Sequence, residues 1–227
     1  MCLVVSFVLD LDIIRQNHVF PLRDNVPSKS FPLVTLVLIG ANAAVFWHEL
    51  TLGRRLDGFI GAHALIPARP SWEDLVTSMF LHGGWMHVLG NLWTLWIFGD
   101  NVEDRLGKFR FLALYLLCGV VAGAVQAAAA PASVIPVIGA SGAIAGVLGA
   151  YLWFFPKAKV TTVVPVFIFL HYAEVPAFLY LGVWFVTQVY SGTLSLGGVA
   201  WWAHVGGFLM GLFWAWRLGA PKRRNSK

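Results

Sequence analysis

The stretch Gly139-Ala140-Ser141-Gly142 places one serine between glycines at the start of an apolar segment. Small residues of this kind line helix contacts in membranes, because they let two backbones approach closely. The same lack of bulk would let a reacting carbonyl reach the serine hydroxyl and the backbone N–H beside it. The stretch therefore has two interpretations, a packing element and a nucleophile, and a base elsewhere in the chain would favour the second.

The composition around this stretch is that of a membrane protein. Of the 227 residues, 58% are hydrophobic, 12% are charged and 11 are tryptophan. A soluble domain carries more charge and fewer apolar residues. Stretches long enough to cross the hydrocarbon core, about 20 residues each, are predicted at 33–50, 75–98, 110–130, 139–155, 172–190 and 199–217. The expected fold is an all-α bundle of six transmembrane helices.

The spans define one membrane domain over residues 31–217. A short cytoplasmic segment, 1–30, is expected before it, and a basic cytoplasmic tail, 218–227, after it. The stretch from Val160 to Tyr190 is too long for one span. Its first third is therefore expected to be an apolar loop.

Lysine and arginine orient the bundle, because cytoplasmic loops carry an excess of both. With the amino end in the cytoplasm, only Arg54, Arg55 and Arg69 fall outside, and the loops at 131–138 and 191–198 contain no basic residue. Both termini are therefore predicted to be cytoplasmic, in a multi-pass protein expected in a bacterial cytoplasmic membrane. The net charge of +5 belongs mainly to this pattern and gives no separate sign of nucleic-acid binding.

Polar side chains inside the spans are the candidates for function, because they are costly in lipid and face the bundle interior. His87 and Asn91 are four residues apart, so they share one helix face. Ser141 lies near the outer start of the fourth span, and His204 lies near the outer start of the sixth. The serine and this histidine are expected at a similar depth in the membrane.

Two ridges of small residues at four-residue spacing predict close contact between the fourth and sixth spans. They are Gly142, Gly146 and Ala150 on one span, and Ala203, Gly207 and Gly211 on the other. Ser141 directly precedes the first ridge, and His204 follows the first residue of the second. Docking of the ridges would bring hydroxyl and imidazole together as a Ser–His dyad, in which a neutral imidazole accepts the serine proton.

His87 and Asn91 suit the remaining role in such chemistry. A tetrahedral oxyanion needs preorganised donors, and an amide and an imidazole N–H can join the backbone N–H of Ser141. Glu174 is predicted near the inner end of the fifth span, across the membrane from Ser141. A dyad is therefore predicted rather than a triad.

Three sequence elements together resemble the motifs of the rhomboid intramembrane serine proteases, over roughly residues 31–217. They are Gly139-Ala140-Ser141-Gly142, His87-Val88-Leu89-Gly90-Asn91 and Ala203-His204-Val205-Gly206-Gly207. The resemblance implies that Ser141 is the nucleophile, that His204 is the general base, and that His87 and Asn91 are oxyanion donors. It also implies structural support from His82, Gly142, Gly207 and Gly211. Glu103-Asp104-Arg105 resembles the family's Glu-x-Arg element after the second span.

The activity that the resemblance implies is hydrolysis of peptide bonds in or near transmembrane helices of single-pass membrane proteins, within the lipid bilayer. Neither a metal nor another cofactor is expected. Two positions depart from the family pattern. Trp72 is followed by Glu73 where arginine is common, and Ala145 stands where an aromatic side chain often packs on the catalytic histidine. His204 is therefore expected to be oriented by another group.

Two other hypotheses remain open. A catalytically silent rhomboid-like protein would bind membrane clients without cutting them, although such a protein would be expected to lose the serine or the histidine. A small transporter could use His171 and Glu174, at helical spacing, as a proton or metal site. Two residues are too few for a metal site, and the chain shows no repeated halves. The sequence gives no oligomeric state.

Overall fold

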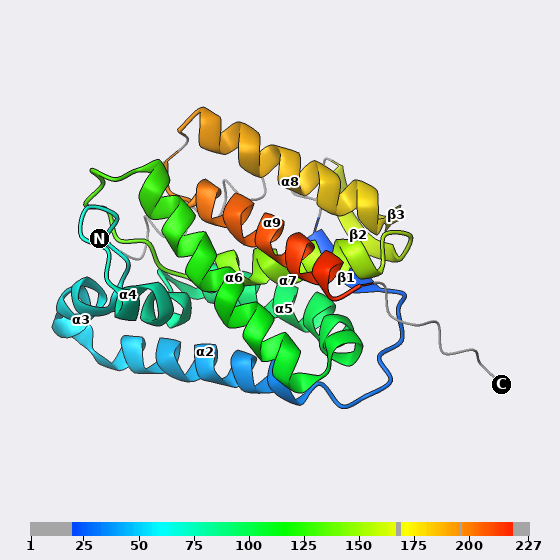
Figure 1. Cartoon of the computed structure of the whole chain (residues 1–227), viewed down its shortest axis with the longest axis horizontal. Coiled ribbons are helices and arrows are strands. Elements are labelled where there is room, and N and C mark those ends of the chain that lie inside the picture. The colour runs from blue at the N-terminus through cyan, green and yellow to red at the C-terminus, as the bar shows by residue number, and fades with distance from the viewer. Residues whose placement is uncertain (1–19, 167–168, 196, 220–227) are drawn as a thin grey trace.

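The computed structural model of the chain describes residues 20–166, 169–195 and 197–219. Within these residues, six helices of 14 to 22 residues form a bundle (Figure 1). They are α2 (Leu33–Thr51), α5 (Trp85–Leu106), α6 (Lys108–Ala129), α7 (Ser141–Phe154), α8 (Ala177–Thr193) and α9 (Trp201–Arg217). Between α2 and α5 lie four short helices, η1 (Gly53–Arg55), α3 (Leu56–His63), α4 (Trp72–Thr77) and η2 (Ser78–Phe80). Each predicted span thus has a helix, but the second and the fifth begin later than expected.

Length and composition identify two described helices that could cross a membrane, Leu33–Thr51 and Lys108–Ala129. Ser141–Phe154 is apolar but shorter. The six-span topology and the cytoplasmic location of both termini therefore stay predictions. Most of the predicted cytoplasmic segment at 1–30 and most of the basic tail at 218–227 lie outside the described residues.

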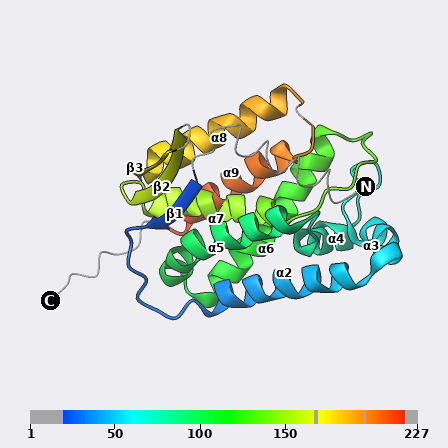
Figure 2. The same ribbon diagram turned by 180° about the vertical axis from the view of Figure 1, so that it is seen from behind.

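The centre of the bundle is α7, in which every residue from Gly142 to Tyr151 is buried. It packs against α5, α6 and α9, while α2 and α8 form opposite edges in both views (Figures 1 and 2). A helix that is apolar on all sides is expected in such a position. The apolar segment that follows Ser141 therefore forms the core.

Helices α7 and α9 meet with their backbones in contact. A Cβ atom at Gly207 would lie 2.0 Å from the carbonyl oxygen of Gly142, and one at Gly211 would lie 1.8 Å from that of Gly146. Such approaches leave no space for any side chain, so only glycine fits at these two positions of α9. The two small-residue ridges thus lie against each other.

A three-stranded antiparallel sheet lies at the end of the bundle where α7 ends (Figure 2). Its strands are β1 (Phe20–Asp24), β2 (Lys159–Val166) and β3 (Phe169–Pro176), in the order β1-β2-β3. The fold is mostly helical, but the all-α expectation and the expected loop after Val160 are wrong here. Valine and threonine dominate β2 and favour extended backbone. Pro176 is extended as well, so α8 begins only at Ala177.

The Glu-x-Arg element ties α5 to the start of α2. Glu103 is buried, and its carboxylate accepts hydrogen bonds from the N–H groups of Val34, at 3.0 Å, and Thr35, at 2.7 Å. The Thr35 hydroxyl donates to it as well, at 2.8 Å. Since the first N–H groups of a helix have no partner within the helix, Glu103 satisfies them and complements the helix dipole.

The segment around Trp72 is organised without the arginine that the resemblance leads one to expect. Trp72 is exposed, and Ser71 caps α4 by accepting a hydrogen bond from the N–H of Asp74 at 3.0 Å. The hydroxyl of Thr77 donates to the carbonyl of His63 at 2.7 Å. Glu73, in the position expected for arginine, therefore lies in the first turn of a short capped helix.

Candidate active site

Ser141 and His204 lie in hydrogen-bonding contact. Ser141 is the first residue of α7, and His204 lies in the first turn of α9. Ser141 Oγ is 2.8 Å from Nε2 of His204, which is within the range of a productive nucleophile–base pair. The close approach of α7 and α9 places the two side chains at one end of the seam.

The other ring nitrogen of His204 contacts a residue that the sequence did not single out. Nδ1 lies 2.8 Å from the side-chain carbonyl oxygen, Oε1, of Gln188 on α8. Gln188 is buried, and its Nε2 donates to the carbonyl of Trp184 at 3.0 Å. A glutamine inside a predicted span was a usable signal, because a buried amide needs partners. The alanine at position 145 was a second signal, because without an aromatic residue there another side chain must orient His204.

Two tryptophan rings flank the imidazole of His204. The ring centroid of Trp184 is 5.9 Å away at an interplanar angle of 32°, and that of Trp201 is 6.2 Å away at 90°. Ala145 itself is buried in α7. Aromatic contacts to this histidine therefore come from α8 and α9 instead of α7.

His87 and Asn91 lie beside the peptide that leads into Ser141. A Cβ atom at Gly139 would be 2.5 Å from Nε2 of His87 and 3.7 Å from Nδ2 of Asn91. Gly139 also has a φ of +121°, which side chains rarely adopt. Gly139 is therefore required both by its own backbone and by its two neighbours.

Both of these side chains have a donor to offer. Nδ1 of His87 accepts a hydrogen bond from the N–H of Gly83 at 3.3 Å, which leaves the hydrogen on Nε2. Asn91 is buried, and its Nδ2 has no hydrogen-bond partner among the described residues. The described part of the chain also gives α7 no side-chain cap, so its first N–H groups remain available. The Nε2–H of His87, the amide of Asn91 and the first N–H groups of α7 thus all lie close to Gly139 and Ser141.

His82 lies next to this group and joins it to α2. The backbone N–H of His82 donates to the carboxylate of Glu49, at 3.2 and 3.3 Å to its two oxygens. Its ring is buried and lies edge-on to the ring of His87, with centroids 5.1 Å apart. This arrangement is compatible with a supporting role for His82, which stays a prediction.

A cavity of about 930 Å³ opens onto these residues. Residues of α5 and α7 line it, together with Trp184 of α8 and His204 of α9. The polar and aromatic side chains that line it include Trp85, His87, Asn91, Ser141, Trp184 and His204. The volume lies in the range of binding sites for small ligands and short peptide segments.

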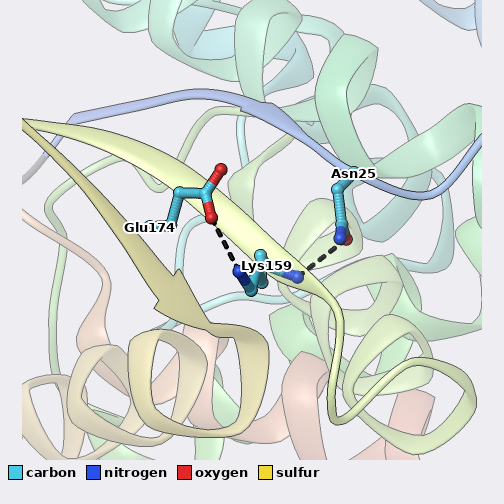
Figure 3. A network of polar contacts seen from close by, with 3 residues as sticks. All are labelled: Asn25, Lys159 and Glu174. Atoms are coloured by element: carbon cyan, nitrogen blue, oxygen red, sulfur yellow. Dashed lines mark hydrogen bonds and ion pairs between the residues drawn. The ribbon is translucent and has the colours of Figure 1, made fainter.

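His171 and Glu174 do not form the helical pair that the transporter hypothesis needs. Both lie on β3, where residues three positions apart point to opposite faces. Glu174 instead pairs with Lys159 at 2.8 Å, and the backbone N–H of Lys159 donates to Asn25 (Figure 3). The described residues contain no group of three or more His, Cys, Asp or Glu side chains that could hold a metal ion.

Comparison with known proteins shows which family the chain resembles. The sequence profile of the rhomboid domain matches residues 69–221. YdcA of Bacillus subtilis (strain 168), whose name describes a rhomboid protease, is 35% identical over 130 residues, or 54% of this chain and 62% of YdcA. The mitochondrial Rhomboid protein 1 of Saccharomyces cerevisiae is 32% identical over 193 residues, or 79% of this chain and 51% of that protein.

Rhomboid protease GluP of Bacillus subtilis is 31% identical over 162 residues, which are 68% of this chain and 28% of GluP. The chain thus spans less than two thirds of the length of each of these relatives. The profile covers more than half of the chain and contains every predicted site residue. The chain therefore belongs to the rhomboid family of integral membrane proteins.

Proposed function

We propose that the chain is a serine endopeptidase that hydrolyses peptide bonds in or near transmembrane helices of membrane proteins. The observation that carries the proposal is the 2.8 Å contact between Ser141 Oγ and His204 Nε2. A serine hydroxyl is a weak nucleophile unless an adjacent base takes its proton. The contact supplies that base, and the family includes proteins named as proteases.

The mechanism divides hydrolysis into two steps. Ser141 Oγ attacks the scissile carbonyl while Nε2 of His204 accepts the hydroxyl proton. The negative oxygen that forms would be stabilised by the N–H of Ser141, Nε2–H of His87 and the amide of Asn91. His204 then protonates the leaving amine. In the second step it activates a water molecule, which releases the acyl group from Ser141.

We expect the substrates to be single-pass transmembrane proteins. The cavity beside Ser141 and His204 is large enough for a short extended segment, and its lining is mostly apolar. Because a helix hides its carbonyls in hydrogen bonds, the segment must unwind before Ser141 can reach one. Glycine, proline or other small residues near the cut lower the cost of unwinding. The reaction needs no cofactor, and we expect it in a bacterial cytoplasmic membrane with both termini inside.

Co-expression tests the proposal. The wild type, Ser141→Ala and His204→Ala are expressed with a panel of tagged single-pass helices that carry small residues, and products are followed by immunoblot. We expect product with the wild type and none with either variant. Ser133→Ala, in the loop before α7, is the matched serine control and should cleave like the wild type.

The comparison among the variants decides the outcome. Equal product from the wild type and Ser141→Ala would assign the cleavage to another protein and reject the dyad. Capture of the same helices by the wild type, with no cleavage of any panel member, would favour the silent client-binding hypothesis instead.

A further inference from the structure

We propose that Gln188 is the positioning residue of the dyad. Its side-chain carbonyl holds His204 in the tautomer that carries hydrogen on Nδ1, so that Nε2 presents its lone pair to Ser141. The proposal rests on the proposed function, because it explains how that base is oriented. It concerns α8, a helix that supplies none of the sequence-predicted site residues.

The orientation of the Gln188 amide is fixed by its own helix. Nε2 of Gln188 donates to the carbonyl of Trp184, at 3.0 Å, and to Oγ1 of Thr187, at 3.1 Å. A carbonyl accepts only, so the flipped amide would set two oxygens against each other. Oε1 of Gln188 must therefore face the imidazole of His204, where it lies 2.8 Å from Nδ1.

This orientation decides which nitrogen of His204 carries the proton. Oε1 of Gln188 can only accept, so Nδ1 must be the donor. A neutral imidazole has one N–H, which leaves Nε2 as the acceptor that faces Ser141 Oγ. The opposite tautomer would place a lone pair against Oε1 and would leave the serine proton without a base.

An amide also suits the apolar surroundings better than a carboxylate. When His204 becomes an imidazolium, its Nδ1–H donates more strongly to Oε1, because the donor is then charged. A neutral glutamine provides this support without a second buried charge, which would be costly between apolar helices. Gln188 is 5% exposed, so solvent does not compete for the contact.

Purified full-length protein in lipid nanodiscs allows a direct test. Gln188→Met keeps the approximate volume but removes the acceptor, whereas Gln188→Glu keeps an acceptor oxygen in place. Gln126→Met is the matched control, because Oε1 of Gln126 accepts from the backbone N–H of Ala203, at 3.2 Å, rather than from the imidazole. Cleavage of a single-pass helix gives kcat and KM for each protein.

We expect Gln188→Met to lower kcat by about 10- to 100-fold, as for residues that orient a reacting imidazole, with little change in KM. Gln188→Glu keeps an acceptor for Nδ1 but sets its second oxygen against the carbonyl of Trp184, so it should recover only part of this loss. Gln126→Met should keep the wild-type kcat. A purely structural role would instead affect both methionine variants similarly and would not be rescued by glutamate.

The nitrogen chemical shifts of ¹⁵N-histidine report the tautomer without any activity. The signal of His204 is assigned as the one lost in His204→Gln. We expect hydrogen on Nδ1 in the wild type, and a shift toward hydrogen on Nε2 in Gln188→Met. Hydrogen on Nε2 in the wild type, or an unchanged tautomer and kcat in Gln188→Met, would overturn the proposal.

The two measurements separate this proposal from the proposed function. A wild type that cleaves, together with a Gln188→Met variant of normal kcat and tautomer, rejects the role of Gln188 and leaves the protease standing. A wild type that cleaves no helix but shows the expected tautomer change rejects the protease and supports the orientation by Gln188.

Discussion

The two ends of α7 differ in whether the polar side chains beside them have hydrogen-bond partners. At the Tyr151 end, both the Tyr151 hydroxyl and the Asn101 amide donate to Asp24 Oδ2, and the N–H of Val26 donates to Oδ1. At the Ser141 end, Nδ2 of Asn91 has no partner within the described residues. An unsatisfied buried donor costs about 1–3 kcal/mol. The Tyr151 end is therefore built for stability, and the Ser141 end keeps donors free for a ligand.

The side chains that would take part in the chemistry also differ from those at the other end of α7. Asp24 supplies a carboxylate at the Tyr151 end, where burial raises its pKa and the hydrogen bond from Tyr151 acts in the opposite direction. The Ser141 end uses imidazole and amide groups: His204, Gln188, His87 and Asn91. The comparison predicts that substitutions will separate stability from cleavage according to the end of α7 that they affect.

The largest expected effect on stability and cleavage comes from a substitution in the contact between α7 and α9. Gly207→Ala would place a Cβ atom 2.0 Å from the Gly142 carbonyl oxygen, so α7 and α9 must separate. We expect a loss of more than about 3 kcal/mol in stability, since backbone cannot yield as side chains do, and no cleavage. Thermal unfolding in detergent and helix cleavage measure the two effects.

Gly182→Ala on α8 is the control for this substitution. A Cβ atom at Gly182 meets no described atom within 4 Å, and alanine favours helix over glycine. The variant should keep its cleavage rate and its unfolding temperature. A similar loss in both variants would show that helix glycines matter for a reason other than close packing.

Asn91→Ala should affect cleavage alone. Removing one donor to a developing oxyanion lowers kcat by about 10²- to 10³-fold. The substitution also removes an unsatisfied buried amide, so the unfolding temperature should stay the same or rise. A lower unfolding temperature with a normal kcat would show that Asn91 serves stability rather than catalysis.

Asp24→Ala should affect stability alone. It leaves the Tyr151 hydroxyl without its acceptor, at a cost of about 1–3 kcal/mol, whereas the Asn101 amide keeps its hydrogen bond to Asp100 Oδ1 at 3.1 Å. Asp24→Asn restores an acceptor oxygen and should recover much of the loss. Cleavage rates, measured well below the unfolding temperature, should match the wild type in both. A selective loss of kcat in Asp24→Ala would contradict the separation.

Glu174→Gln should have the smallest effect. The hydrogen bond from Lys159 and its charge lower the pKa of Glu174. The pair therefore stabilises the fold at pH values above the usual carboxyl pKa. This stabilisation is lost as the pH falls through the lowered pKa of Glu174. Both side chains are more than half exposed, which weakens the pair by solvent screening. Unfolding temperature and kcat should be nearly unchanged at neutral pH. A clear drop in kcat would return this residue to the functional site.

The sequence predicts a helix in each of the six long apolar stretches, because apolar runs of this length favour helices. It also predicts that Ser141 and His204 would lie together, because the ridges beside them fix how α7 and α9 pack. The sheet escaped prediction because a run of apolar β-branched residues suits a loop, a strand or a buried helix equally. Gln188 escaped because its role depends on how α8 lies against α9, which residue spacing does not encode.

Covalent labelling tests the central claim most directly. Purified wild type in nanodiscs is treated with a fluorophosphonate, which reacts with activated serines, and the adduct is located by peptide mass spectrometry. The dyad predicts one adduct, on Ser141, and its loss in His204→Ala. Absence of an adduct on Ser141 in folded wild type, or equal labelling of Ser141 in His204→Ala, would contradict it.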